Sequence, residues 1–215
     1  MQTDNTISSD TVQTISSELM DAERECESIE PLSDRWNLTP DHAYQIQLAG
    51  IREKIDNGAR VTGKKIGLTS KGMQDMLGVT QPDYGHLLDT MAYTGGEVIP
   101  TNRFLYPRIE AEIGFLLGED IAGPNVTTLD VLEATEAFVP TMEIIDSRIH
   151  DWNVQFVDTV SDNASSGAYV VGSQIFPTHS IDDIRLVGMV HLKNGRVVQT
   201  GAGAATLGNP AYCVA

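Results

Sequence analysis

The sequence of 215 residues has few cysteines, few basic residues and no long apolar run. Its two cysteines, Cys26 and Cys213, are isolated from each other and from any Cys-x-x-Cys or Cys/His cluster. This excludes a disulfide framework and a zinc ribbon, and it predicts two small core residues. No apolar run approaches the roughly 18 residues of a membrane span. Because the start, Met-Gln-Thr-Asp-Asn, lacks the basic n-region of a signal peptide, we expect a cytoplasmic protein with no membrane partner.

Positive charge is scarce, since 14 basic residues stand against 30 acidic ones and the formal net charge is -16. Phosphodiester backbones and anionic lipids repel such a polyanion, so we expect no nucleic-acid partner. Nine acids and one base lie in residues 1–34, which therefore carry half of the net charge. This balance fits either a halophilic protein or a protein with an acidic N-terminal extension.

The N-terminal part of the chain has the pattern of helices. Apolar residues recur at spacings of three and four over residues 12–22, and Ser9 or Asp10 could cap the helix that they predict. A Thr-Pro-Asp start at residues 39–41 and an Asn-Gly end at residues 57–58 delimit a second helix.

After the second helix, short apolar runs separated by Gly, Pro and Asp indicate a mainly β body. Strands are expected at residues 60–68, 108–117, 138–146 and 167–172, a hairpin over residues 187–200, a helix at 70–77 that buries Met73, Met76 and Leu77, and a helix at 127–137. The fold class is therefore α+β. We expect two parts, an acidic helical segment (1–58) and a β-rich domain (59–215).

Two glutamates share one face of the strand predicted at residues 108–117. Alternation places Glu110 and Glu112 together, about 7 Å apart at their Cα atoms. An ordinary half-exposed strand would give the same pattern. The run from Gly114 to Leu117, however, has no polar alternation, which suggests that both faces of this strand are covered.

A third glutamate, Glu143, lies inside the apolar run at residues 138–146. Burying an unpaired ionised carboxylate costs on the order of several kcal/mol, so Glu143 needs a cation. Either an arginine such as Arg108 or Arg148 pairs with it, or a metal ion does. Three glutamates from two strands, without cysteine or clustered histidine, favour a hard ion with oxygen ligands, Mg²⁺ or Mn²⁺, over zinc.

Two lysines, Lys64 and Lys65, lie in the glycine-flanked apolar strand at residues 60–68. Because neighbours on a strand point to opposite faces, one of the two must point inward. A lysine that faces the carboxylates could bind an anionic substrate or move a proton. The other is expected to be a surface lysine whose aliphatic stem lies along the protein.

Five blocks of sequence together resemble one protein family. The blocks are VTGKKIGLTS (61–70), QPDYGHLLDTM (81–91), PRIEAEIGFLL (107–117), MEIIDSRIHDW (142–152) and DTVSDNASSGAYVVG (158–172). They resemble the 2-keto-4-pentenoate hydratase and 4-oxalocrotonate decarboxylase branch of the fumarylacetoacetate hydrolase superfamily. The resemblance covers most of residues 40–215.

The resemblance implies a fold and a set of site residues. The fold is a mixed β-barrel or roll with N-terminal helices, so that residues 59–215 form the metal-binding catalytic domain. The metal is Mg²⁺ or Mn²⁺, held by residues that match Glu110, Glu112 and Glu143. The residues placed at the substrate, the first three also as catalytic groups, are Lys65, Asp83, Ser161 and Asn163.

The activity that the resemblance implies is the addition of water to a small 2-oxo acid, a 2-oxo-4-enoate or 2-hydroxydienoate of meta-cleavage aromatic catabolism. A 2-oxo acid can offer its carboxylate and carbonyl oxygens to one divalent ion, which polarises the carbonyl as a Lewis acid. The alternatives, in order, are a 4-oxalocrotonate decarboxylase, a C–C bond hydrolase with His86 or His150 as its base, and a non-catalytic partner subunit. A homo-oligomer is expected, with a complex with a paralogous decarboxylase or hydratase as a further possibility.

The end of the chain departs from the family pattern. Residues 208–215 resemble a loop and the first turn of a helix, after which relatives continue through that helix and further strands. We therefore expect a catalytic domain that is incomplete at its C-terminus and has open sheet edges, either because the chain is a fragment or because it is a shortened form.

Overall fold

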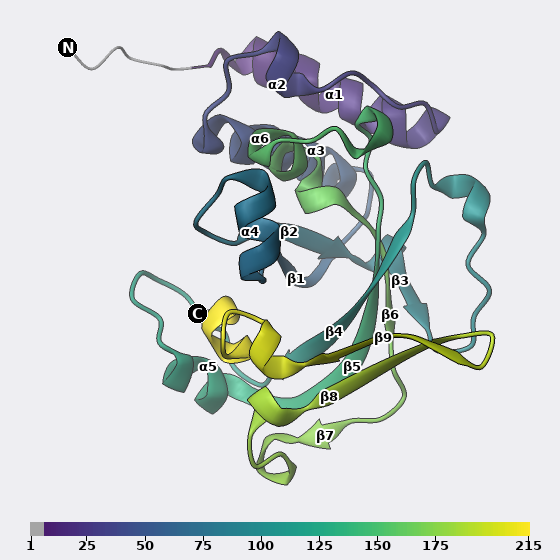
Figure 1. The fold of residues 1–215 in the computed structure, drawn as a ribbon. Coiled ribbons are helices and arrows are strands. Elements are labelled where there is room, and N and C mark those ends of the chain that lie inside the picture. The colour runs from purple at the N-terminus through teal and green to yellow at the C-terminus, as the bar shows by residue number, and fades with distance from the viewer. Residues whose placement is uncertain (1–6) are drawn as a thin grey trace.

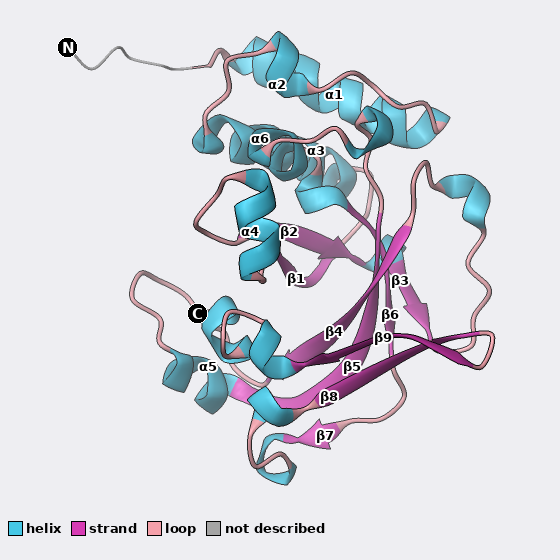
Figure 2. Ribbon diagram, in the orientation of Figure 1, coloured by secondary structure: helices cyan, strands magenta, loops and turns pink. Residues whose placement is uncertain are grey.

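A computed structural model describes residues 7–215 of the chain, so the first residues of the expected helical segment lie outside the described part. Helices gather at one end of the molecule and curved strands fill the other (Figure 1, Figure 2). Across residues 7–215, no helix is both long enough and apolar enough to cross a membrane.

Four helices form the first end of the molecule. They are α1 (Ser9–Glu25), α2 (Leu32–Arg35), α3 (Pro40–Asp56) and α6 (Phe156–Ser161). Thr39 caps α3 as expected, because its hydroxyl accepts from the His42 N–H and proline occupies the first turn. The N-cap of α1 is Ser8, whose hydroxyl accepts from the Thr11 N–H, and not Ser9 or Asp10, which begin the helix itself.

The N-terminal helices share their apolar core with a segment that comes much later in the chain. One cluster of buried side chains joins Ile15, Leu19, Leu32 and Ile46 to Ile149. A second cluster packs Ala43 of α3 against Phe156 and Val160 of α6. Part of the buried surface of segment 1–58 is thus supplied by residues 149–160.

The strands form three sheets. They are β1 (Val61–Gly67), β2 (Asp83–Leu88), β3 (Ala92–Thr94), β4 (Arg108–Leu117), β5 (Thr135–Ile145), β6 (Ser166–Val171), β7 (Phe176–Pro177), β8 (Gly188–Lys193) and β9 (Arg196–Ala202). One sheet has the order β3-β6-β5-β4 with β7 on β5, and the pairs β1-β2 and β8-β9 form the others. The mixed α+β class is confirmed, and closure into a barrel stays a prediction.

Two short helices lie between strands, α4 (Lys71–Leu77) and α5 (Thr128–Ala134), and a third, α7 (Pro210–Val214), follows β9. The expected burial on α4 is wrong for two methionines, because Met73 and Met76 are exposed and Gln74 is buried instead. The Gln74 amide donates to the Leu68 carbonyl, which holds the polar face of α4 against the protein. The helix α5 ends three residues earlier than expected, because Thr135 already pairs with β4. Both cysteines are half-buried rather than in a core cluster.

Ile15→Ala should destabilise the protein by about 2–5 kcal/mol, because Ile15 is 0% exposed and its truncation leaves a cavity. The shared core with Ile149 predicts a single calorimetric transition that shifts as a whole. Ile55→Ala on α3 is the control, and it should cost far less because Ile55 is 42% exposed. Two separate transitions, of which only one shifts, would instead support an independently folding segment 1–58.

Candidate active site

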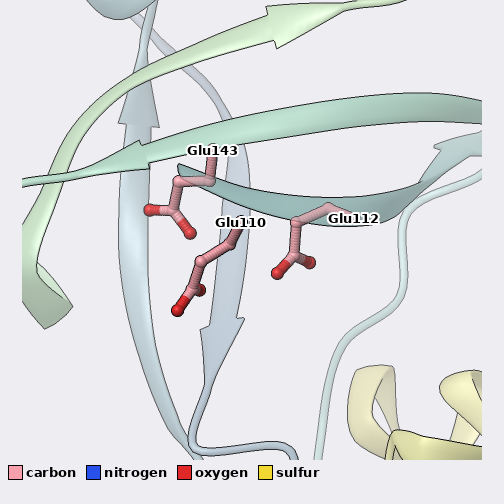
Figure 3. Close-up of side chains that lie close together, drawn as sticks. All are labelled: Glu110, Glu112 and Glu143. Atoms are coloured by element: carbon pink, nitrogen blue, oxygen red, sulfur yellow. The ribbon is translucent and has the colours of Figure 1, made fainter. Parts of the chain in front are cut away.

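The pairing of β4 with β5 brings three glutamates together. Glu110 lies directly opposite Glu143 in the antiparallel register, and Glu112 follows on the same face of β4. One carboxylate oxygen from each side chain lies within 4.8 Å of the other two. Figure 3 shows the three side chains pointing into one space. Glu143 is buried, Glu112 is half-buried and Glu110 is exposed, so the cluster runs from the interior to the surface.

Crowding makes full ionisation of these carboxylates unfavourable without a cation. Burial, followed by the charges of Glu143 and Glu110, raises the pKa of Glu112 to about 8. Burial also raises the pKa of Glu143. In the described part of the chain, Glu143 Oε1 accepts no hydrogen bond. Three converging oxygen donors, one of them buried and unbonded, fit a divalent ion that prefers oxygen ligands.

The protein cation beside Glu143 is Lys65, whose Nζ lies 3.3 Å from Glu143 Oε1. Its carboxylate neighbours, Glu143 foremost, outweigh the effect of burial and raise the pKa of Lys65, so the ammonium is charged. Of the two alternatives for the partner of Glu143, an arginine or a metal ion, the arginine is wrong. Arg148 is paired with Asp162, and the guanidinium of Arg108 lies over a tryptophan ring.

Asp83 faces the same space from the neighbouring strand. Asp83 lies opposite Gly67 in the β1-β2 register, diagonal to Lys65 on the same face. It is buried, and its Oδ1 has no hydrogen-bond partner among the described residues. Burial raises the pKa of Asp83, and the charge of Lys65 opposes this shift. Asp83, which is buried, and Lys65, which is largely buried, are thus two ionisable groups on one face of a two-stranded sheet.

Two glycines that were not predicted as site residues make room for these side chains. A Cβ on Gly67 would collide with the Asp83 carboxylate. A Cβ on Gly85 would lie 3.0 Å from the Cδ of Lys65, its partner across the sheet, and 2.5 Å from the Asn163 carbonyl oxygen. The available signal in the sequence was one glycine in each of the two strands, Gly67 close to Lys65 and Gly85 close to Asp83, because glycine in a strand often marks a close approach of other groups.

The segment after α6 contributes a carbonyl to the site. Lys65 Nζ donates to the Ala164 carbonyl oxygen at 2.7 Å. Asn163, Ala164 and Ser165 all have left-handed backbone angles, with φ of 52°, 51° and 54°. This conformation costs non-glycine residues roughly 1–2 kcal/mol each. Ser161 has a buried hydroxyl without a hydrogen-bond partner among residues 7–215.

Neither histidine that a C–C bond hydrolase would need faces the carboxylates. His86 lies opposite Lys64, and therefore on the other face of the β1-β2 pair from Lys65. Its Nε2 is 2.7 Å from Lys64 Nζ and its Nδ1 is 2.9 Å from the Gln47 amide oxygen. Burial lowers the pKa of His86 to about 4, which keeps the ring neutral. His150 lies at the surface beside Ser28.

The fold and the cluster define a class of protein: an enzyme on a mixed α+β scaffold with three converging glutamates that could hold a metal ion and a largely buried lysine beside them. No family model matches the chain, but several individual proteins are similar to it.

The chain is 45% identical over 206 residues to 2-hydroxypent-2,4-dienoate hydratase of Pseudomonas putida. The matched residues are 95% of this chain and 92% of the relative. It is 48% identical over 187 residues to 2-keto-4-pentenoate hydratase of Paraburkholderia xenovorans (strain LB400), covering 86% and 69%. The solved structure of 4-oxalocrotonate decarboxylase from Pseudomonas putida G7, complexed with magnesium and adipate, matches with a TM-score of 0.93 at 33% identity, over 96% of this chain and 79% of that one. The chain belongs to the 2-keto-4-pentenoate hydratase and 4-oxalocrotonate decarboxylase family of the fumarylacetoacetate hydrolase superfamily.

Glu112→Gln should weaken metal binding without unfolding the protein. At pH 7 the ion-free wild type already holds a proton on Glu112, so the ion-free variant should melt at or above it. Mg²⁺ at a hundred times its Kd should stabilise the wild type by about 2.7 kcal/mol. The variant should gain much less in the same thermal melts.

Glu136→Gln is the matched control, because Glu136 is an exposed glutamate of β5 outside the cluster. This control should keep the full Mg²⁺ shift. The same full shift in Glu112→Gln would mean that Glu112 is not a metal ligand.

Proposed function

We propose that this protein is a divalent-metal-dependent hydratase that adds water to a 2-hydroxydienoate or 2-oxo-4-enoate of meta-cleavage aromatic catabolism. One observation carries the proposal: a charged Lys65, whose side chain is only 10% exposed, lies beside three converging glutamates in a chain that is 45% and 48% identical to curated hydratases. The substrate is a small 2-oxo acid.

The three glutamates of the cluster, Glu110, Glu112 and Glu143, would hold Mg²⁺ or Mn²⁺. The exclusively oxygen-donating set supports these hard ions. When bound, the ion supplies Lewis-acid polarisation of the substrate carbonyl.

Lys65 and Asp83 would manage the charge and the protons. The 2-hydroxydienoate first gains a proton at carbon 5 and loses one from its 2-hydroxyl, which gives the 2-oxo-3-enoate. In the hydration step the hydroxyl of water then joins carbon 4, the other proton of water is taken up by a base, and a proton reaches carbon 3. Electron density moves onto the carbonyl oxygen meanwhile, and the positive charge at Lys65 Nζ stabilises it there. Asp83 is suited to accept and return a proton, because burial raises its pKa and its Oδ1 is free of hydrogen bonds to the described residues.

Ser161 and Asn163 complete the proposed substrate site. The buried hydroxyl of Ser161, which lacks a protein partner within the described chain, supports a hydrogen bond to the substrate. The side-chain amide of Asn163 accepts from the His86 N–H and donates to the His86 carbonyl. A direct contact between Asn163 and the substrate therefore stays a prediction.

The setting of the enzyme is also part of the proposal. A cytoplasmic homo-oligomer with a completed barrel or roll is proposed, with a paralogous decarboxylase or hydratase as a further partner. Exposed apolar side chains on the hairpin β8-β9 support burial against another surface; they are Val190, Leu192, Val197 and Val198.

Decarboxylation of 4-oxalocrotonate is the second candidate. The structural match to 4-oxalocrotonate decarboxylase, with a TM-score of 0.93, favours it. Hydratase relatives at higher sequence identity favour hydration.

One assay distinguishes the two activities. The protein is incubated with 2-hydroxypenta-2,4-dienoate and with 2-oxo-3-hexenedioate, each with and without Mg²⁺, and the absorbance of the dienol is followed. We expect Mg²⁺-dependent decay with the first substrate and no release of CO₂ from the second. CO₂ release from the second substrate alone would reverse the assignment.

Replacement of the two neighbouring lysines tests which one is functional. Lys65→Met should lower kcat by about 10²–10⁴-fold, because it removes the charge beside Glu143. Lys64→Met should leave turnover close to that of the wild type, because Lys64 lies on the opposite face. Thermal melts confirm that both variants fold. The reverse ranking in steady-state kinetics would mean that Lys64 is the functional lysine.

A further inference from the structure

Lys65 has two protein partners that impose different constraints on it. Glu143 attracts the ammonium by charge across 3.3 Å, whereas the Ala164 carbonyl accepts a hydrogen bond at 2.7 Å. An ammonium has three N–H donors. One donor is directed to the carbonyl, and the ion pair with Glu143 restricts the position of the ammonium further, so that a remaining N–H can be offered to a bound substrate.

The Ala164 carbonyl that accepts from Lys65 lies in a turn of three left-handed residues, 163–165. None of the three is glycine, so the conformation must be held by other contacts. The side chain of Asn163 holds one side of the turn. Its Oδ1 accepts from the His86 N–H at 2.7 Å and its Nδ2 donates to the His86 carbonyl at 2.9 Å.

Arg148 holds the two ends of the same turn. Its guanidinium donates to the carbonyl oxygens of Asp162 at 2.8 Å and Ser166 at 3.1 Å, the residues immediately before and after the turn. The same guanidinium forms an ion pair with the Asp162 carboxylate. Both side chains are buried, so the charge of Arg148 is used entirely within this structure.

We propose that Asn163 and Arg148 are positioning residues: they hold the left-handed turn 163–165 so that the Ala164 carbonyl fixes Lys65 Nζ between Glu143 and the substrate. This role in orienting Lys65 rests on the proposed function. Without the carbonyl, the ammonium is drawn toward the carboxylates and its remaining N–H no longer points to the substrate.

Asn163→Gly tests the proposal most directly. Glycine adopts the left-handed conformation more easily than asparagine but cannot dock on His86. We expect a folded protein with kcat lowered on the order of 10²-fold and a much smaller change in KM. Asn194→Gly is the matched control, because Asn194 has a φ of 53° in the hairpin β8-β9, and it should keep wild-type kinetics.

The same substitution in a Lys65→Met background separates positioning from general damage. If Asn163 acts through Lys65, Asn163→Gly causes no further loss in that background. An equal fold-loss in both backgrounds, or an unchanged kcat in the single variant, would overturn the proposal. Should Asn163→Gly fail to fold, Asn163→Asp keeps the acceptor for the His86 N–H, and an intermediate kcat is then expected. Full activity in that variant would overturn it too.

A structural readout makes the test independent of turnover. In a crystal structure of the folded variant, we expect Lys65 Nζ to have left the Ala164 carbonyl and moved toward Glu143. An Nζ in the wild-type position would contradict the proposal. If the wild type hydrates neither substrate, the proposed function fails while this measurement still decides whether the turn positions Lys65.

Discussion

The imbalance between negative and positive charge around Lys65 is the constraint on which the rest of the site depends. Four carboxyl groups, those of Asp83 and the three glutamates, influence one buried ammonium. One ammonium cannot neutralise four carboxylates in a partly dry space, so the remaining charge must be balanced by a proton or by a further cation. The pKa of Glu112, raised to about 8, corresponds to charge balance by a proton. A divalent ion would be the alternative. The need of this cluster for a further proton or cation is thus a consequence of how the strands pair.

The scaffold is arranged to keep this unfavourable group of charges in place. The β4-β5 ladder sets the spacing of the glutamates, and glycines in β1 and β2 leave space for Lys65 and Asp83. The helical end of the molecule supplies a firm support, because α6 packs on α3 and leads directly into the turn at 163–165. A buried ion pair is weak evidence for stability in general. The pair formed by Arg148 and Asp162 therefore makes most sense as a geometric device, since its guanidinium also binds the carbonyls at both ends of the turn.

Local patterns in the sequence predicted the groups that carry the chemistry but not their partners. Alternation placed Glu110 and Glu112 on one face, and the lone Glu143 in an apolar run predicted a cation; both expectations are confirmed. The identity of that cation depends on how β1 lies against β5, which no local period encodes. The sequence therefore left an arginine, Arg108 or Arg148, and a metal ion as alternatives, and it did not identify Lys65 as the partner of Glu143. The predicted burial of the α4 methionines was wrong for a related reason. An apolar pattern on a seven-residue helix does not specify which face packs against the protein. The buried face holds Gln74, which donates a hydrogen bond to the Leu68 carbonyl.

Hydration and decarboxylation of these substrates share one electronic requirement, since each moves electrons toward the carbonyl of a 2-oxo acid. The proposed site, with a divalent ion held by three glutamates and a lysine beside them, would meet that requirement equally for both. The close structural match to a decarboxylase is therefore expected even if the chain is a hydratase. The outcome must be decided at the other end of the substrate, where a proton or water has to reach a particular carbon. Under the proposed function Asp83 is suited to that step, because it is buried, its pKa is raised by burial, its Oδ1 has no hydrogen-bond partner among the described residues, and it lies outside the glutamate cluster.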